Sequence, residues 1–187
     1  MTITCESYRY ARVIPEDLYE IGDICRFRAM VWHATLQQTG HVFANSEIRD
    51  EWDASATHWV VRDVQEQIAA CGRLIVAREW TGIPEPSEYI GKGIPEVQGL
   101  IAAPDRIVVR PDCQKGGLAS RLLELQEQEA ERLGAGIAVR QASPGMLRCI
   151  AKRGWIPVGP ASPDPKFPDV AFTVAYKLLR PLTGECP

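Results

Sequence analysis

Two adjacent glycines lie where a β-branched run gives way to a leucine-rich helical pattern. The stretch VVRPDCQKGGLASRLLELQ, residues 108–126, places Gln114 and Lys115 directly before Gly116 and Gly117. The first N–H groups of a helix have no partner inside the helix and lie at the positive end of its dipole. Glycines also let the main chain approach a phosphate closely, so this turn is a candidate anion-binding site. The alternative is an ordinary strand-to-helix turn that uses glycine for its geometry alone.

The turn differs from the two common nucleotide-binding loops. No Gly-Lys-Ser/Thr ends it, as in a Walker loop, and the dinucleotide fingerprint G-x-G-x-x-G is absent. The longer stretch VRPDCQKGGLASRLL instead resembles the signature of the GCN5-related N-acetyltransferases (GNAT), in which Gln/Arg-x-x-Gly-x-Gly/Ala joins a strand to a helix. Gln114, Gly117 and Ala119 fill the three defining positions, and IAKRGW, residues 150–155, is similar to the K-x-G-F ending of a later helix in that family.

The resemblance implies that the bound anion is coenzyme A and that the reaction is transfer of an acetyl group from acetyl-CoA to a primary amine of a small molecule. Backbone N–H groups from Lys115 to Ser120 would hold the pyrophosphate, while Ile107 and Val109 would pair with the pantetheine arm as with a further strand. Two residues of the next helix would flank that arm. The predicted cofactor-binding residues are therefore Ile107, Val108, Val109, Gln114, Lys115, Gly116, Gly117, Leu118, Ala119, Ser120, Ser143 and Arg148.

Attack of an amine on a thioester requires three kinds of group. The amine must lose its proton, the carbonyl oxygen needs a hydrogen-bond donor, and the departing sulfur needs a proton. By the resemblance, the Val109 N–H is the candidate oxyanion donor and Asp105 is the candidate base. An aspartate is shorter than the glutamate usual in the family, so we expect a bridging water. The alternative for Asp105 is a turn residue at the strand entry after Pro104.

The proton donor is the point at which the sequence departs from the family. Relatives commonly place a tyrosine four residues before the glycine of K-x-G-F, and Ile150 stands there in this chain. A thiolate with a pKa near about 8.5 is a tolerable leaving group without a donor. Cys149 and Tyr176 are candidate substitutes, with a buried structural role as the alternative for each. Ile150 also leaves a second class of function open, a non-catalytic CoA-binding or regulatory module.

The front half of the chain carries a second resemblance, to the acyl-homoserine lactone synthases. It rests on FRAMVW, RDEWD, HWVVRD and CGRLIV, between residues 27 and 76. It implies an autoinducer-synthase-like acyltransferase with a longer acyl donor as a variant function. The candidate substrate-binding residues are Arg28, Trp32, Asp50, Asp53 and Arg73. An acidic pair that faces a pocket would attract a protonated amine, and the alternative is a solvated helix end.

The elements that would position these residues follow from apolar periodicity. Alternating and short apolar runs predict strands, and helical spacing predicts helices, with Gly134 at the end of the helix that follows the glycine turn. We expect strands at residues 8–14, 58–63, 67–77, 105–111, 136–143 and 170–179, and helices at 15–36, 46–52, 118–133 and 144–155. The proline-rich segments 81–104 and 157–168 are predicted loops that shape the acceptor pocket.

Together with the family layout, this order predicts one α/β (α+β) domain over residues 1–187. We expect a central, mixed, mostly antiparallel and twisted sheet of six to seven strands, flanked by about four helices. By the resemblance, the sheet would splay between strands four and five.

Composition narrows the partners and the location. The 187 residues are 45% hydrophobic and 24% charged, with a net charge of −3, which is typical of a globular protein and unlike one that binds nucleic acid. Six scattered cysteines without a C-x-x-C pair predict reduced thiols and no metal site. No apolar run has the length of a membrane span, and no secretion signal is found. We therefore expect a cytoplasmic protein. By the family resemblance, it would act on a small amine and could pair as a homodimer.

Overall fold

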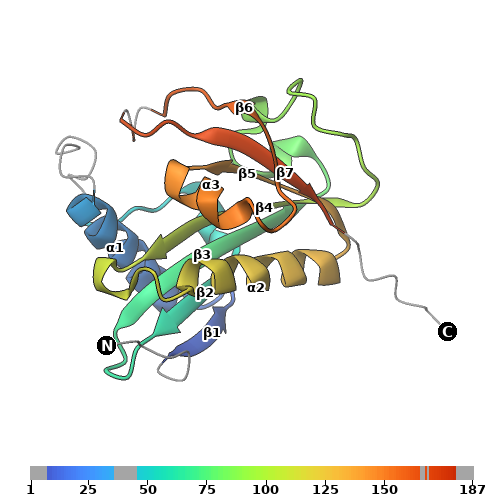
Figure 1. Cartoon of the computed structure of the whole chain (residues 1–187). Coiled ribbons are helices and arrows are strands. Elements are labelled where there is room, and N and C mark those ends of the chain that lie inside the picture. The colour runs from blue at the N-terminus through green and yellow to red at the C-terminus, as the bar shows by residue number, and fades with distance from the viewer. Residues whose placement is uncertain (1–7, 36–45, 165–166, 168, 180–187) are drawn as a thin grey trace. The chain divides into compact units, whose positions relative to one another are not determined.

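The computed structural model describes residues 8–35, 46–164, 167 and 169–179. Its elements are labelled in Figure 1. The strands are β1 Arg9–Val13, β2 Thr57–Arg62, β3 Ile68–Ala77, β4 Leu100–Val109, β5 Ala135–Ala142, β6 Ile156–Pro160 and β7 Thr173–Leu178. The α-helices are α1 Leu18–Thr35, α2 Leu118–Arg132 and α3 Pro144–Ile150, and the 3-10 turns are η2 Glu51–Ala54, η3 Trp80–Gly82, η4 Pro86–Glu88 and η5 Pro111–Cys113.

The strands form one seven-stranded sheet in the order β1-β2-β3-β4-β5-β7-β6. β1 pairs antiparallel with β2, and β7 pairs antiparallel with both β5 and β6, while β4 and β5 run parallel. The predicted mixed sheet of six to seven strands is therefore confirmed.

β4 and β5 separate soon after they meet. Their pairing ends at Ala102 on β4 and Ala138 on β5. From Val139 to Ala142, the partners of β5 are residues of β7. Beyond Ala138, the sheet therefore loses the β4–β5 ladder, which confirms the predicted separation of strands four and five. Backbone groups that leave a ladder need other partners, and a ligand can supply them.

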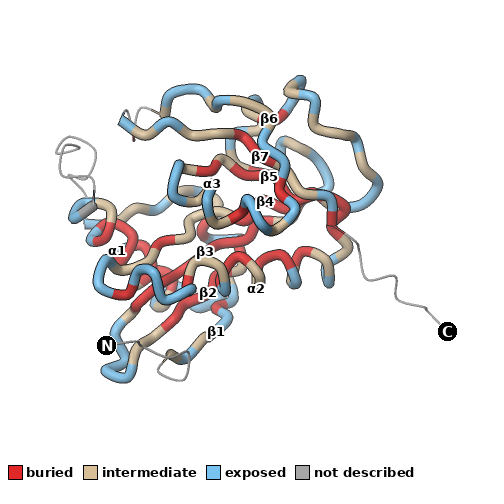
Figure 2. Tube along the Cα trace, viewed as in Figure 1, coloured by how far each residue is buried: buried red, intermediate tan, exposed pale blue. Residues whose placement is uncertain are grey.

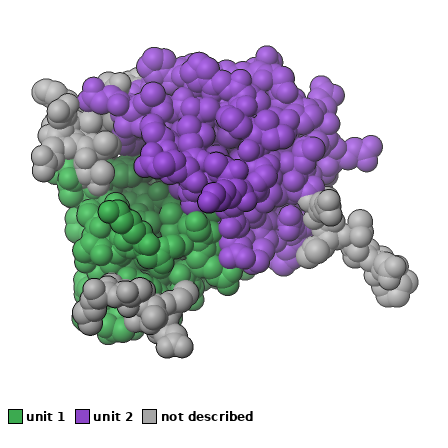
Figure 3. Space-filling view, in the orientation of Figure 1, with its two compact units in different colours: residues 1–73, 106–123 green, residues 74–105, 124–187 purple. Residues whose placement is uncertain are grey.

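The chain divides into two compact units, residues 1–73 with 106–123 and residues 74–105 with 124–187 (Figure 3). In unit 1, helical spacing places Ile21, Ile24 and Val31 on one side of α1. That side belongs to a core completed by Val13, Cys25, Phe27, Val60, Cys71 and Val108. Arg28 follows the same spacing and is fully buried, so a charged residue lies on the apolar side of the helix.

In unit 2, β5 is buried along nearly its whole length and contacts α3 (Figure 2). The apolar side predicted for the helix after the glycine turn is only partly correct. Leu125 is half-buried and Leu133 is 39% exposed, whereas the polar residues Gln126 and Glu127 are buried. Gly134, with φ of 86°, ends α2 as predicted.

Two predicted boundaries near the turn and the aspartates are wrong. β4 begins at Leu100 and continues through Pro104, because residues 100–103 are apolar and continue the buried strand. The helix expected at residues 46–52 is a single 3-10 turn, η2. It starts late because the Asp50 side chain accepts a hydrogen bond from the Trp52 N–H and so fixes the N-terminus of the turn.

Two further boundaries are wrong toward the C-terminus. The helix expected at residues 144–155 ends at Ile150, and a turn carries the chain to Gly154, whose φ is 78°. The expected loop 157–168 contains most of β6, whose two prolines are tolerated because β6 is an edge strand. Leu36, the last residue of the first predicted helix, lies outside the described residues, as do residues 165, 166 and 168 of that loop.

Cysteines, metal sites and membrane spans can be described only for the part of the chain given above. Cys25, Cys71, Cys113 and Cys149 are free thiols, and Cys5 and Cys186 lie outside the described residues. Within those residues, no cluster of three His, Cys, Asp or Glu side chains has a metal-binding arrangement. None of the described helices combines the length and the apolar composition that a membrane crossing requires.

Candidate active site

The glycine turn joins β4 to α2 through η5. Pro111 opens η5, and the side-chain amide of Gln114 turns back to donate to the Val109 carbonyl at 3.4 Å. Lys115 and Gly117 then adopt left-handed backbone angles, with φ of 66° and 83°. A Cβ added at Gly117 would meet no atom within 4 Å, so the space beside this backbone is open. Open space beside a left-handed backbone allows the close approach that an anion needs.

The first turn of α2 supplies the hydrogen-bond donors. The Arg121 N–H donates to the Gly117 carbonyl at 3.0 Å, which closes the first turn. The N–H groups of Leu118 and Ala119 precede this bond and so lie outside the helix's own hydrogen-bond ladder. They point toward the N-terminal end, where the helix dipole is positive. The turn is therefore built to accept an anion.

Arg110, which the sequence analysis did not single out, fixes the base of this turn. Its N–H donates to the Ala69 carbonyl at 2.9 Å, and its guanidinium bonds Asp63 at 2.8 Å and Asp112 at 2.7 Å. The hydrogen bond to Asp112 is the main cause that raises the pKa of Arg110. The signal in the sequence was an arginine placed directly between a β-branched strand and Pro111.

A second feature of unit 1 is a buried cluster of arginines and aspartates. Arg28 Nη1 donates to Asp53 Oδ1 at 2.6 Å, and Arg73 Nη1 lies 3.0 Å from the same oxygen. Arg28 Nη2 is 3.2 Å from Nδ1 of His58, whose Nε2 is 2.9 Å from the Asp53 carbonyl. Because a guanidinium only donates, Nδ1 must accept and the proton must be on Nε2. Burial, followed by the charge of Arg28, lowers the pKa of His58 from 6.5, so this imidazole is neutral at pH 7.

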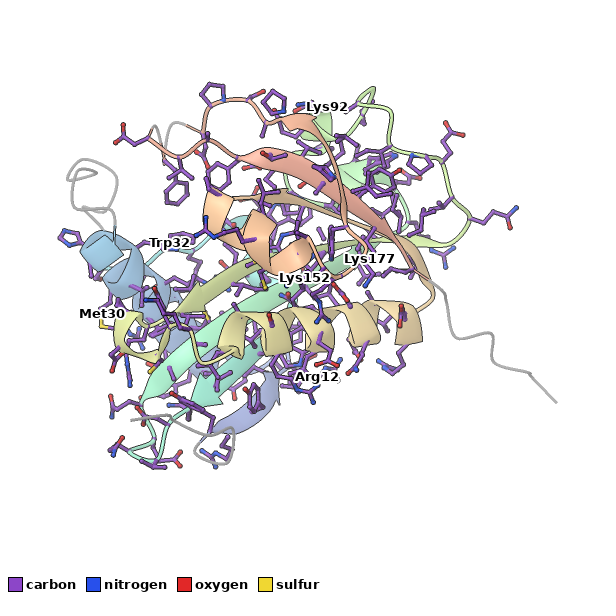
Figure 4. All side chains as sticks on the ribbon, in the orientation of Figure 1. Arg12, Met30, Trp32, Lys92, Lys152 and Lys177 are labelled. Carbon is purple, nitrogen blue, oxygen red and sulfur yellow. The ribbon has the colours of Figure 1, made fainter. Side chains whose placement is uncertain are left out.

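The second carboxylate of the cluster, Asp50, forms side-chain hydrogen bonds with residues of both β3 and β4. It accepts hydrogen bonds from Arg73 and, at 2.8 Å, from Arg106 Nη2. The Arg106 guanidinium carbon lies 5.3 Å from the ring centroid of Trp32 on α1 (Figure 4), within the range of a cation–π contact. Asp53 Oδ2 also accepts from the Asp50 N–H at 3.0 Å, so the two aspartates cap η2 together, as their spacing predicts.

Opposite charges within this cluster shift the pKa values of its carboxylates. Although burial would raise it, the guanidinium groups of Arg28 and Arg73 hold the pKa of Asp53 well below its usual range. Burial would also raise the pKa of Asp50, but the hydrogen bond from Arg73 and the charge of Arg106 lower it. Three guanidinium groups face two carboxylates, so the cluster carries one positive charge in excess. The solvated helix end is excluded for Asp53, which is 1% exposed.

Arg106 adopts a backbone angle that is rare inside a strand. Its φ is 52°, the left-handed region that costs free energy for a residue with a side chain. The contacts of its guanidinium with Asp50 and Trp32 hold it there. Strained residues of this kind concentrate at functional sites. Beyond it, Val108 is buried in the core of unit 1, so any contact of Val108 with a cofactor is through its backbone.

Asp105, Ser143, Arg148 and Ile150 lie in unit 2. Asp105 is half-buried, and its carbonyl accepts from the Gln126 side chain at 3.2 Å. Ser143 caps α3 by accepting from the Met146 N–H at 3.3 Å, and Arg148 is exposed on the same helix. Ile150 is 2% exposed and packs as a core residue, so the departure from the family at this position is a buried apolar side chain.

A model of the acetyltransferase (GNAT) family matches residues 27–155. The chain belongs to this family. The family predicted from the signature VRPDCQKGGLASRLL is confirmed, and with it a GNAT acyltransferase fold. No curated protein matches the sequence.

Solved structures extend the comparison. An acyl-CoA N-acyltransferase from Pseudomonas aeruginosa has 17% identity and a TM-score of 0.61, with 91% of this chain and 99% of that one covered. The acyl-homoserine lactone (AHL) synthase LasI has 15% identity and a TM-score of 0.61, with 90% of this chain and 87% of that one covered. A second such synthase, the CoA-dependent BjaI, has 13% identity and a TM-score of 0.68, with 92% of this chain and 84% of that one covered. At these identities the likeness is one of fold.

The GNAT chain thus brings some predicted residues together and adds others. Gln114 to Ser120 form one continuous turn, and the five residues predicted from the front half meet in one cluster. Sequence reasoning missed His58 and Arg106. Both lie in strands rich in Val, and the sequence clue in each case was a polar side chain within such a strand.

Proposed function

We propose that this GNAT acyltransferase transfers an acetyl group from acetyl-CoA to the primary amine of a small molecule by direct attack on the thioester. The observation that carries the proposal is the turn before α2, where the left-handed Lys115 and Gly117 border open space. Two structural neighbours support CoA as the ligand. The NatC complex was solved with CoA and BjaI with isopentyl-CoA, at 9% and 12% identity.

In this proposal the turn binds the diphosphate of the donor. The N–H groups from Lys115 to Ser120 would bond its oxygens, with Lys115 as a nearby cation. The backbones of Ile107 and Val109 would bond the pantetheine arm, because β4 loses its β5 partner after Ala102. Ser143 and Arg148 would flank the arm.

The chemical step would use two groups of β4. Asp105 would take the proton of the attacking amine, directly or through a water, so that the nitrogen lone pair is available. The Val109 N–H would donate to the carbonyl oxygen as it gains negative charge. The C–N bond forms, the C–S bond breaks with its electron pair on sulfur, and the nitrogen gives its second proton to water.

A thiol-release assay with a panel of small primary amines tests this proposal. We expect at least one amine to be acetylated, and Asp105→Asn to lower kcat/KM for it by about 100-fold or more because the base is lost. Asp23→Asn, a surface change on α1, should leave the rate unaltered. If CoA binds, no amine is acetylated, and the two variants behave alike, the chain is a CoA-binding module and the proposal is wrong.

A second candidate is an autoinducer-synthase-like acyltransferase with a longer acyl donor. The buried cluster of Arg28, Trp32, Asp50, Asp53 and Arg73 favours it, since these are the residues that the front-half resemblance names. BjaI was solved with S-adenosylmethionine as well as isopentyl-CoA. In the same assay, thiol release that requires S-adenosylmethionine and rises with acyl length would favour this candidate over the first.

A further inference from the structure

Arg140 on β5 is a buried cation whose hydrogen-bond capacity is not filled. It is 4% exposed, and its Nε and Nη1 atoms are buried without a hydrogen-bond partner. The guanidinium carbon lies 5.8 Å from the centroid of the Trp155 ring. This contact covers one face of the guanidinium and gives its N–H donors no acceptor. Buried donors without an acceptor are unfavourable, which points to a ligand that supplies one.

Arg140 lies where the sheet opens. The last residue of β5 that pairs with β4 is Ala138, and Arg140 follows two residues later. On β4, Asp105 likewise follows the last paired residue, Ala102. Burial is the largest influence on the pKa of Arg140, and the charge of Asp105 is the next largest. The two side chains therefore interact electrostatically. Arg140 and Asp105, both in unit 2, therefore lie beyond the end of the β4–β5 ladder.

Arg140 stays positively charged, and its buried Nε and Nη1 atoms have no hydrogen-bond partner. Burial lowers its pKa to about 10, and Asp105, Tyr89, Cys149 and Glu127 oppose this in that order, so it is protonated at pH 7. Asp105 on β4, Tyr89 after η4, Cys149 on α3 and Glu127 on α2 are thus the titratable groups that act on it.

Glu127 does not serve as its counterion. The Glu127 carboxylate accepts from Trp155 Nε1 at 2.8 Å, from Lys177 Nζ at 2.7 Å and from Arg153 Nη2 at 3.3 Å. It is thus already shared by two other cations. Glu127 is therefore engaged by other donors, and the buried Nε and Nη1 atoms of Arg140 stay without an acceptor.

The reaction produces a negative charge on the departing sulfur. A proton donor or a nearby cation stabilises such a thiolate. Ile150, 2% exposed on α3, stands where relatives commonly place a tyrosine, and its side chain has no proton to give. Cys149, the residue directly before it, is one of the groups that act on Arg140. The guanidinium thus lies near the part of α3 from which a tyrosine would act.

We propose that Arg140 stabilises the negative charge of the departing CoA sulfur by ion pairing, in place of a proton donor. This rests on the proposed function. After Asp105 has taken one proton from the protonated amine, the neutral nitrogen bonds the acyl carbon and gives its second proton to water, the C–S bond breaks, and the thiolate keeps the electron pair beside Arg140. Arg140 keeps its own protons throughout. The thiolate takes a proton from water once CoA is released.

The bound thiol itself reports on this cation, and no acceptor amine is needed. The absorbance of the thiolate at about 240 nm is followed as the pH of the CoA complex is raised. The same titration with desulfo-CoA gives the contribution of the protein's own cysteines, which is subtracted. We expect the pKa of the bound thiol to be lower than that of free CoA by about one pH unit or more, because a cation within a few ångströms favours the thiolate.

Three variants assign the effect. Arg140→Gln should return the bound thiol to the pKa of free CoA, and Arg140→Lys should keep part of the lowering because it keeps the charge. Lys152→Gln, which removes an exposed positive charge just after α3 (Figure 4), should change nothing. Circular dichroism and thermal melting check that each variant is folded.

Two results would overturn the inference while leaving the proposed function in place. One is a wild-type complex that binds CoA with an unaltered thiol pKa, which needs no variant and so stands even if Arg140→Gln does not fold. The other is a lowered pKa that persists in Arg140→Gln. If wild-type protein does not bind CoA at all, the proposed function and this inference are both wrong.

Discussion

At the scale of single residues, Arg28 illustrates how this protein handles buried charge. It takes a core position of α1, is fully buried, and meets Asp53 and His58 there. Removing ions from water is unfavourable, so a buried pair adds little net stability, yet loss of one partner is severe because the other charge is left alone. Asp53 is the partner on which both Arg28 and Arg73 depend.

Replacing Asp53 with asparagine should therefore lower the free energy of unfolding by about 3–5 kcal/mol. Urea unfolding measures this change, and Asp23→Asn, which breaks an exposed pair with Arg26, should leave stability nearly as it is. Because the folded-state pKa of Asp53 is depressed, its contribution is present above the unfolded value of about 3.9 and is lost as pH falls through the folded value. Equal stability of Asp53→Asn and wild type at pH 7 would contradict the importance of the cluster.

Among the elements, α2 is limited by glycines at both ends. Gly117 precedes it and Gly134 follows it, with φ of 83° and 86°. The Gly134 N–H donates to the Glu131 carbonyl at 3.0 Å, so the left-handed residue closes the last turn. The helix that presents the amides of the turn is thereby fixed in length.

Gly134→Ala should lower the free energy of unfolding by about 1 kcal/mol or more, since the added Cβ finds open space but an unfavourable φ. Gly145→Ala is the matched control, because Gly145 lies within α3 and an added Cβ would make only ordinary contacts. It should raise stability by about 0.4–1 kcal/mol. Thermal or urea unfolding of both variants measures these changes, and a stabilising Gly134→Ala would disagree with the helix end described here.

For the molecule as a whole, features set by neighbouring residues could be predicted, and those set by distant residues could not. All the strands except β6, the glycine turn and the end of α2 follow from periodicity and from glycine chemistry, which act over a few neighbouring residues. Arg106 and Arg140 could not be anticipated, because their roles depend on partners from distant segments such as Asp50 and Trp155. The strand through Pro104 was missed for the same reason, since burial by the sheet outweighs the local signal of a proline.

Calorimetric titration with CoA measures whether the turn before α2 binds the diphosphate, as we propose. Wild-type protein should bind, and Gly117→Glu should raise Kd at least about tenfold, or 1.4 kcal/mol, because a carboxylate would enter the space meant for phosphate. Gly91→Glu is the matched control, since Gly91 has φ of 78° and equally open space, and it should bind as wild type does. Unchanged affinity in Gly117→Glu, or no binding by the wild type, would contradict the account.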